Sequence, residues 1–248
     1  MSTHLERTAT PDGLFLWVMH RFAEVFEDHA ILKGGMALRL IDSPRSTTDI
    51  DYVFVPYASK NDIRERVETV LREIEDAEVD IALHSKMLRA ALRVDDAAIQ
   101  VEINVAMECS TTPMSTGGFA EHLGKLPRVV RIMESDWALA HKLAAWNERR
   151  LLRDLYDCYF FVARLNVMPA ADVLDLRLDE IRSRRPGQEK RTSMTRADLA
   201  RELRTQVGEL SQKNLEAELG GLLPREELAG LAPRVTAATL RLAEWLEA

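Results

Sequence analysis

The sequence contains little cysteine, no surplus of positive charge and no long apolar run, and each absence excludes a class of protein. Its two cysteines, Cys109 and Cys158, lie far apart in apolar contexts, which favours reduced buried thiols and fits a cytoplasmic chain. The formal net charge of -7 excludes a surface that is basic overall, although a local basic patch remains compatible with it. No apolar run approaches membrane-spanning length, and the N-terminus lacks a signal-peptide pattern.

What remains is an ordinary globular composition, 46% hydrophobic and 29% charged, in a chain of 248 residues. That length suits one large domain or two modest ones. Glycine and proline are absent from Ser135 to Met168, where helix-forming residues dominate. We therefore predict an α+β unit with a mixed sheet over residues 1–134, followed by a helical domain over residues 135–248.

The spacing of apolar residues predicts the elements of both parts. In the first part it predicts helices over residues 11–29, 36–41 and 60–77. Alternating and β-branched segments predict strands over residues 30–33, 49–55, 78–84, 87–94, 98–107 and 128–133. In the second part we expect helices over 170–182, 196–219 and 225–247, while the region before them forms one straight helix or two helices that break at W-N-E-R-R.

Two aspartates interrupt the predicted strand D-I-D-Y-V-F-V. Because side chains alternate along a strand, Asp49 and Asp51 project from one face. The other face carries Ile50, Tyr52 and Phe54, which can join a core. Neighbouring carboxylates suit a hard divalent cation such as Mg²⁺, which commonly takes phosphate oxygens as further ligands. The pair is either a metal site or an exposed strand end with two solvated acids.

A glycine pair, Gly34 and Gly35, lies between a predicted strand and a predicted helix. Glycine lets backbone N–H groups approach an anion closely, although a tight turn without a ligand is the alternative. An anion site so close in sequence to D-x-D indicates binding of a polyphosphate and its metal. Glu102 is the only acid of the strand 98–107, where it is either the third metal ligand or part of a solvated face.

These residues resemble the polymerase-beta-type nucleotidyltransferases and, more closely, the AbiEii family of toxin nucleotidyltransferases, which includes the MenT toxins of mycobacteria. One block of the resemblance is K-G-G-x-A-L at residues 33–38, then R-S-T-T and D-I-D at 45–51. The other is Lys142 followed by R-D-x-x-D at 153–157. Together the blocks span roughly residues 30–165. The wider superfamily has Gly-Ser where this chain has Gly34-Gly35, so backbone N–H groups take the place of a motif serine.

The resemblance implies a nucleotidyltransferase fold and a role for each matched residue. The implied metal ligands for Mg²⁺ or Mn²⁺ are Asp49, Asp51 and Glu102. The implied phosphate-binding residues are Gly34, Gly35, Arg45, Ser46, Thr47 and Lys142. Asp49, Asp51, Lys142 and Asp154 are the implied catalytic residues, with Asp154 either orienting Lys142 or helping to deprotonate the acceptor. Asp157 is expected to be structural and to pair with Arg149 or Arg153.

The resemblance also implies a substrate and partners. Family toxins transfer NMP from an NTP to tRNA 3′ ends and block translation, and a cognate antitoxin is expected. An acidic protein needs a local basic surface to bind tRNA. One cluster is either that surface or a solvated loop: Arg182, Arg184, Arg185, Lys190, Arg191 and Arg196.

Three alternatives differ from a tRNA-modifying toxin. One is a nucleotidyltransferase that acts on a small molecule such as an aminoglycoside. Another is a non-catalytic interaction module with this fold, which the presence of both D-x-D acids disfavours. The third is a structural domain that binds metal without turnover.

Overall fold

The structure, a computed structural model, describes residues 10–84, 87–181 and 193–248. The chain divides into two compact units, Met1–Met133 and Glu134–Ala248. The first unit is α+β with a mixed sheet and the second is helical, so the predicted fold class is confirmed.

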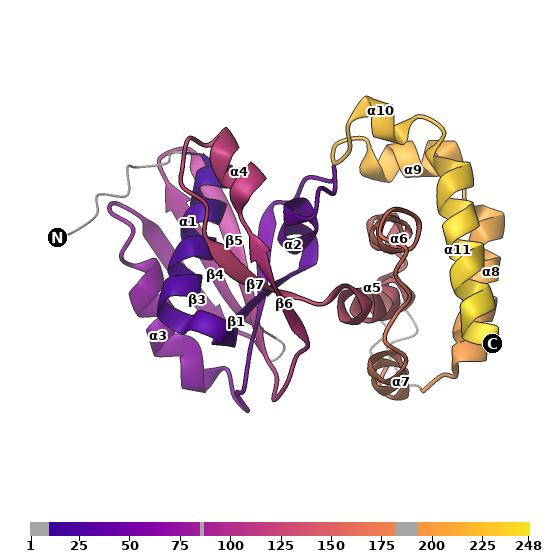
Figure 1. Ribbon diagram of the computed structural model, residues 1–248, viewed down its shortest axis with the longest axis horizontal. Coiled ribbons are helices and arrows are strands. Elements are labelled where there is room, and N and C mark those ends of the chain that lie inside the picture. Colours follow the sequence, from indigo (N-terminus) through magenta and orange to yellow (C-terminus); the bar gives the residue numbers. More distant parts are fainter. Residues whose placement is uncertain (1–9, 85–86, 182–192) are drawn as a thin grey trace. The chain divides into compact units, whose positions relative to one another are not determined.

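The first unit contains a seven-stranded sheet in the order β3-β4-β5-β2-β1-β7-β6 (Figure 1). The strands are β1 (Ala30–Lys33), β2 (Asp49–Phe54), β3 (Glu78–Leu83), β4 (Leu88–Val94), β5 (Ala97–Val105), β6 (Thr111–Ser115) and β7 (Val129–Met133). Strand β2 runs parallel to β5 and β1 runs parallel to β7, whereas the other neighbours are antiparallel. The six predicted strands are confirmed. The sequence did not predict β6, an edge strand that accommodates Pro113 where a central strand would not.

Among the described residues of this unit the α-helices are α1 (Pro11–Phe26), α2 (Gly34–Leu40), α3 (Asn61–Leu71) and α4 (Gly117–His122), and a 3₁₀ turn, Glu27–His29, follows α1. Thr10 caps α1, since its Oγ1 accepts a hydrogen bond of 3.1 Å from the Gly13 N–H. Helix α2 begins at the glycine pair itself. The predicted helix 60–77 ends at Leu71, and the chain then turns through Asp76, which has a φ of 57°. The sequence did not predict the short α4.

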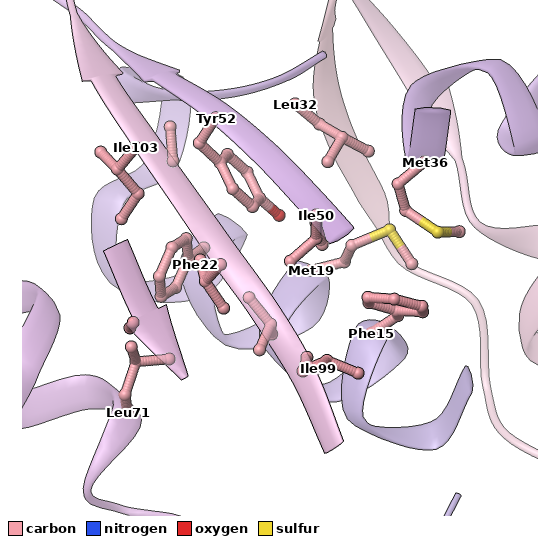
Figure 2. Close-up of a cluster of buried hydrophobic side chains, with 14 of the residues drawn as sticks. Phe15, Met19, Phe22, Leu32, Met36, Ile50, Tyr52, Leu71, Ile99 and Ile103 are labelled. Carbon is pink, nitrogen blue, oxygen red and sulfur yellow. The ribbon is translucent and has the colours of Figure 1, made fainter. Parts of the chain in front are cut away.

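The core of this unit lies between α1 and one face of the sheet. Phe22 of α1 packs against Tyr52 with ring centroids 5.0 Å apart, and Phe26 packs against Phe54 at 4.8 Å. Figure 2 shows Phe15, Met19 and Phe22 gathered with Ile50 and Tyr52 of β2. The predicted alternation in β2 is therefore confirmed. Its apolar side chains anchor the strand in the core and leave the two aspartates on the opposite face.

The second unit consists of helices in its described residues. They are α5 (Ser135–Arg149), α6 (Leu152–Tyr159), α7 (Ala171–Asp179), α8 (Arg196–Glu209), α9 (Gln212–Leu219), α10 (Arg225–Leu228) and α11 (Leu231–Glu247), and a π-helical turn, Phe160–Arg164, continues α6. Two predicted helices are each divided. Ser211 caps α9 by accepting from the Asn214 N–H, and Gly230, with a φ of 62°, separates α10 from α11.

Of the two alternatives for this region, one straight helix or two helices that break at W-N-E-R-R, the structure has the second. The chain turns at Arg150, which has a left-handed φ of 59°. Its guanidinium lies 4.2 Å from the Trp146 ring centroid and forms a 2.5 Å ion pair with Glu202. These contacts stabilise a conformation that costs energy for a residue other than glycine. Across the described ranges, no helix has the length and apolarity that a membrane span requires.

Candidate functional site

The pairing of three central strands aligns charged residues on one face of the sheet. In the parallel pair of β2 and β5, Asp51 lies opposite Glu102 and Asp49 lies opposite Gln100. On the other side of β2, Asp51 lies opposite Lys33 of β1. Residues at one register position share a face, so Lys33, Asp51 and Glu102 form a row. This register places Glu102 beside the D-x-D pair, which no fixed sequence spacing could establish.

The carboxylates of this row are paired with cationic or polar side chains. Lys33 Nζ lies 3.7 Å from Asp51 Oδ1. Glu102 Oε1 accepts hydrogen bonds from Arg89 Nη2 at 2.8 Å and from Gln100 Nε2 at 2.7 Å. The side chains of Asp51 and Glu102 are 25% and 18% exposed, so solvent reaches both.

The donor set of this face fits a divalent cation. Asp49 and Asp51 offer hard carboxylate oxygens from a strand fixed in the core, and an ammonium group already lies within ion-pair distance of Asp51. Glu102 shares the face, but its Oε1 is bonded to Arg89 and Gln100. Among the residues that the structure describes, no three Asp, Glu, His or Cys side chains form a complete ligand set. The face therefore presents two candidate metal ligands, Asp49 and Asp51, and a third candidate, Glu102, whose Oε1 is engaged by Arg89 and Gln100.

The glycine pair is in close contact with the aspartates and the following turn. Gly34 has a φ of 71°, and a Cβ at this position would lie 2.1 Å from Asp51 Oδ2. A Cβ at Gly35 would lie 2.8 Å from Thr47 Oγ1 and 3.1 Å from a guanidinium nitrogen of Arg45. Each glycine is thus required by a close approach of backbone to side chain. The structure brings together Gly34, Gly35, Asp51 and the turn at residues 45–47.

Within that turn the three candidate phosphate-binding side chains differ in their surroundings. Arg45 is buried, and its Nη1 donates to the Ser46 carbonyl at 3.1 Å. Thr47 Oγ1 donates to the Asp49 carbonyl at 3.1 Å and so fixes the start of β2. Ser46 is exposed. Thr47 therefore positions Asp49, whereas Ser46 offers a hydroxyl at the surface.

In the second unit, Lys142 of α5 lies beside two buried aspartates of α6. Its Nζ is 2.6 Å from Asp157 Oδ2 and 3.9 Å from Asp154 Oδ1. Arg149 binds Asp154 through two hydrogen bonds, of 2.6 and 3.0 Å. The side chains of Asp154 and Asp157 are only 2% and 0% exposed, and buried carboxylates require such partners.

Lys142 is a partner of Asp157 that the expectation of Arg149 or Arg153 did not include. Asp157 forms its close ion pair with Lys142, and Arg149 holds Asp154. The break at Arg150 lets α6 pack back against α5, so residues that are distant in sequence meet.

Cys158 follows these buried acids on α6 and is itself buried. Burial, followed by the negative charges of Asp154 and Asp157, raises the pKa of its thiol well above the usual value. A protonated thiol is a poor nucleophile, so Cys158 is not a candidate for covalent catalysis.

A comparison with protein families identifies the chain. The family model of the AbiEii nucleotidyltransferase toxins, of type IV toxin–antitoxin systems, matches residues 17–239. The chain belongs to the AbiEii toxin family. It is therefore a nucleotidyltransferase, as the sequence predicts, and an antitoxin partner is implied. A comparison with curated proteins found no match.

Solved structures share the fold of this AbiEii protein. MenT4, a nucleotidyltransferase toxin of Mycobacterium tuberculosis H37Rv, is 16% identical with a TM-score of 0.59, covering 94% of this chain and 82% of MenT4. A putative nucleotidyltransferase from H. pylori is 14% identical with a TM-score of 0.54, covering 96% and 95%. JHP933 from Helicobacter pylori is 15% identical with a TM-score of 0.51, covering 94% and 90%. At these identities the likeness shows the nucleotidyltransferase fold.

Most of the candidate tRNA-binding cluster of this AbiEii protein lies outside the described residues, namely Arg182, Arg184, Arg185, Lys190 and Arg191. The remaining member, Arg196, begins α8 and forms two hydrogen bonds with Asp175, of 2.7 and 2.5 Å. The hydrogen bonds to Asp175 raise the pKa of Arg196. Arg196 is thus already paired with an acid.

Proposed function

We propose that this AbiEii-family enzyme transfers a nucleoside monophosphate from an NTP to the 3′ end of a tRNA, with Mg²⁺ or Mn²⁺, and thereby blocks translation in the cytoplasm. The observation that carries the proposal is the contact between the glycine pair and the D-x-D strand. It joins a close backbone approach, suited to phosphate, to a pair of hard oxygen ligands.

The proposed metal ligands are Asp49 and Asp51, with Glu102 as the third. These carboxylates would hold a divalent cation, which would supply stabilisation of the charge on the attacking and leaving oxygens. Strand β2 contributes rigidity, because Ile50 and Tyr52 are buried on its other face. The carboxylates therefore keep their separation while the acceptor hydroxyl attacks the α-phosphorus and the bond to pyrophosphate breaks.

The proposed phosphate-binding residues are Gly34, Gly35, Arg45, Ser46 and Thr47. The missing side chains of the glycines leave the backbone accessible beside Asp51. Arg45 supplies positive charge at the same turn, and the exposed Ser46 hydroxyl is a further donor. Thr47 acts indirectly, since its hydroxyl is bonded to the Asp49 backbone.

Lys142 is the proposed phosphate ligand of the second unit, and the surrounding acids support a positioning role for its neighbours. Asp157 holds the ammonium group at 2.6 Å. Both oxygens of Asp154 accept hydrogen bonds from Arg149, which favours orientation of Lys142 over proton transfer from the acceptor. We propose that the antitoxin expected for this family opposes the activity, and that the acceptor is tRNA by resemblance to family toxins.

The test is incubation of the full chain with Mg²⁺, each labelled NTP in turn, and total tRNA. Wild type is expected to label tRNA, and Asp49→Asn is expected to lower the rate by about a thousandfold or more, because it removes one metal ligand. Asp80→Asn is the matched control, since Asp80 is an exposed aspartate on β3 of the same sheet. It should transfer at the wild-type rate. Label on a small molecule but on no RNA would overturn the proposed acceptor.

A further inference from the structure

Arg89 of β4 is bound to the third candidate acid of the site. Arg89 and Glu102 lie opposite each other in the antiparallel pair of β4 and β5, with Nη2 2.8 Å from Oε1. Gln100 Nε2 donates to the same oxygen at 2.7 Å. One carboxylate oxygen of Glu102 therefore carries two donors, and it cannot serve a metal ion while both remain.

The charges on this face oppose binding of a metal ion by itself. Two bases, Lys33 and Arg89, lie directly opposite two of the candidate ligands, Asp51 and Glu102. A guanidinium bonded directly to a candidate ligand competes for its oxygen and also repels a divalent cation. The arrangement thus holds the third acid in place, keeps its Oε1 engaged and sets a positive charge beside it.

The side chain of Arg89 is suited to exchange partners. It is 44% exposed, so the guanidinium can leave Glu102 without a large desolvation cost. Its planar group matches the oxygens of a phosphate as well as those of a carboxylate. A nucleoside triphosphate bound beside Asp51 would offer such oxygens.

We propose that Arg89 is an electrostatic latch on Glu102. The guanidinium holds Oε1 of Glu102 and repels a cation there until the triphosphate of a nucleotide draws it away, and Glu102 would then complete the metal site with Asp49 and Asp51. The latch rests on the proposed function, since it assumes that these acids bind metal and that the substrate is an NTP. Metal and nucleotide therefore increase each other's affinity, by the same factor in each direction.

The first test measures Mn²⁺ binding to the full chain without nucleotide, by counting free Mn²⁺ in an electron paramagnetic resonance titration. Arg89→Ala should bind Mn²⁺ roughly tenfold more tightly than wild type, because one opposing charge is removed. Arg93→Ala is the matched control, since Arg93 lies four residues along β4 on the same face. It should bind as wild type does. Adding Glu102→Gln to Arg89→Ala should remove the gain.

An Arg89→Ala variant that binds Mn²⁺ no more tightly than Arg93→Ala would overturn the latch. Weaker binding in Arg89→Ala would instead make Arg89 a residue that only orients Glu102. The second test repeats the titration with a non-hydrolysable NTP analogue. The factor by which the analogue tightens Mn²⁺ binding should shrink in Arg89→Ala, and an unchanged factor contradicts the exchange of partners.

Failure of the latch and failure of the proposed function give different results. Wild-type transfer of label to tRNA, with equal Mn²⁺ affinity in Arg89→Ala and wild type, removes the latch and leaves the function. Tighter Mn²⁺ binding in Arg89→Ala that is lost with Glu102→Gln, together with a smaller analogue effect, supports the latch even where tRNA is not the acceptor.

Discussion

The two units hold their carboxylates in opposite ways. In the first, Asp51 is 25% exposed and lies 3.7 Å from Lys33. In the second, Asp157 is fully buried and lies 2.6 Å from Lys142. A loosely paired acid at the surface can exchange its partner for a metal ion, whereas a buried acid cannot release its counter-charge cheaply. The comparison indicates exchangeable ligands in the first unit and fixed positioning groups in the second.

The candidate ligands of the first unit depend on the close approach of Gly34 to Asp51, so a side chain added at Gly34 should have the largest effect of the changes compared below. Gly34→Ala would place a Cβ 2.1 Å from Asp51 Oδ2, at a backbone φ of 71° that alanine disfavours. We expect kcat/KM for nucleotidyl transfer to fall by about a hundredfold or more, since a ligand displaced by an ångström misaligns the reaction.

Gly118→Ala is the control for Gly34→Ala, because a Cβ at Gly118 meets no atom within 4 Å. It should keep the wild-type rate. Equal rates in the two variants would show that the contact between Gly34 and Asp51 is not needed.

The buried carboxylates of the second unit are tested by measuring the free energy of unfolding. Asp157→Asn should lower the free energy of unfolding by about 3 kcal/mol, because it removes the closer of the two buried counter-charges of Lys142. Asp51→Asn should cost less than about 1 kcal/mol, since its ion pair is partly exposed. Denaturant titration followed by tryptophan fluorescence measures both, with Trp137, Trp146 and Trp245 reporting on the second unit and Trp17 on the first. Equal losses of unfolding free energy in the two variants would contradict the distinction between the buried and the exposed carboxylates.

Local sequence patterns account for what could be predicted about the carboxylates of the first unit. Alternation alone separates Asp49 and Asp51 from Ile50 and Tyr52, because the period of a strand is a local property. The position of Glu102 beside Asp51 could not be predicted in this way. It depends on the register of β2 and β5, whose paired residues lie about fifty positions apart in the sequence. Arg89 was missed for the same reason.

The contacts of the buried carboxylates in the second unit were predicted less completely, because they depend on a change of chain direction. A straight helix would have placed Arg149, Arg153 and Asp157 on one broad face, and Arg153 and Asp157 keep their spacing of four residues within α6. The turn at Arg150 depends on contacts with Trp146 and with Glu202, which lies on another helix. Only after that turn does Asp157 meet Lys142. The sequence contains the break but not the direction of the helix after it.

A buried histidine adds a pH test to the first unit. His20 is 7% exposed, and its Nε2 lies 2.9 Å from Thr116 Oγ1. Burial, followed by the positive charge of Arg128, lowers the pKa of His20 from 6.5 to about 4. The unfolded chain therefore binds the proton first, so stability is complete above pH 6.5 and declines as the pH falls toward 4. The loss should be about 3 kcal/mol at most.

Denaturant titrations between pH 7 and 4 measure this loss. His20→Gln should abolish the part of the slope that arises from His20, because glutamine does not titrate. An identical slope in wild type and His20→Gln would assign the acid sensitivity to other groups. A slope that is lost in His20→Gln would extend the comparison of the two units. The first unit would then contain a buried side chain, His20, that is stable only when neutral, whereas the second contains buried charged side chains that are paired.

The smallest effect is expected at Arg196, where exposure and geometry point in different directions. Its side chain is 35% exposed, as an exchangeable base would be, yet it binds Asp175 through two short hydrogen bonds. If the geometry of the two hydrogen bonds determines whether the pair separates, Arg196 remains bound to Asp175. Arg196→Ala should then cost less than about 1 kcal/mol of stability and leave the salt dependence of tRNA binding unchanged. A phosphate contact would instead lower the slope of log K against log salt by about one. Asp175→Asn is the matched variant, and by freeing Arg196 it should strengthen tRNA binding. A lower slope of log K against log salt in Arg196→Ala would show that the exposure of a side chain, and not the geometry of its ion pair, decides whether the pair exchanges its partner.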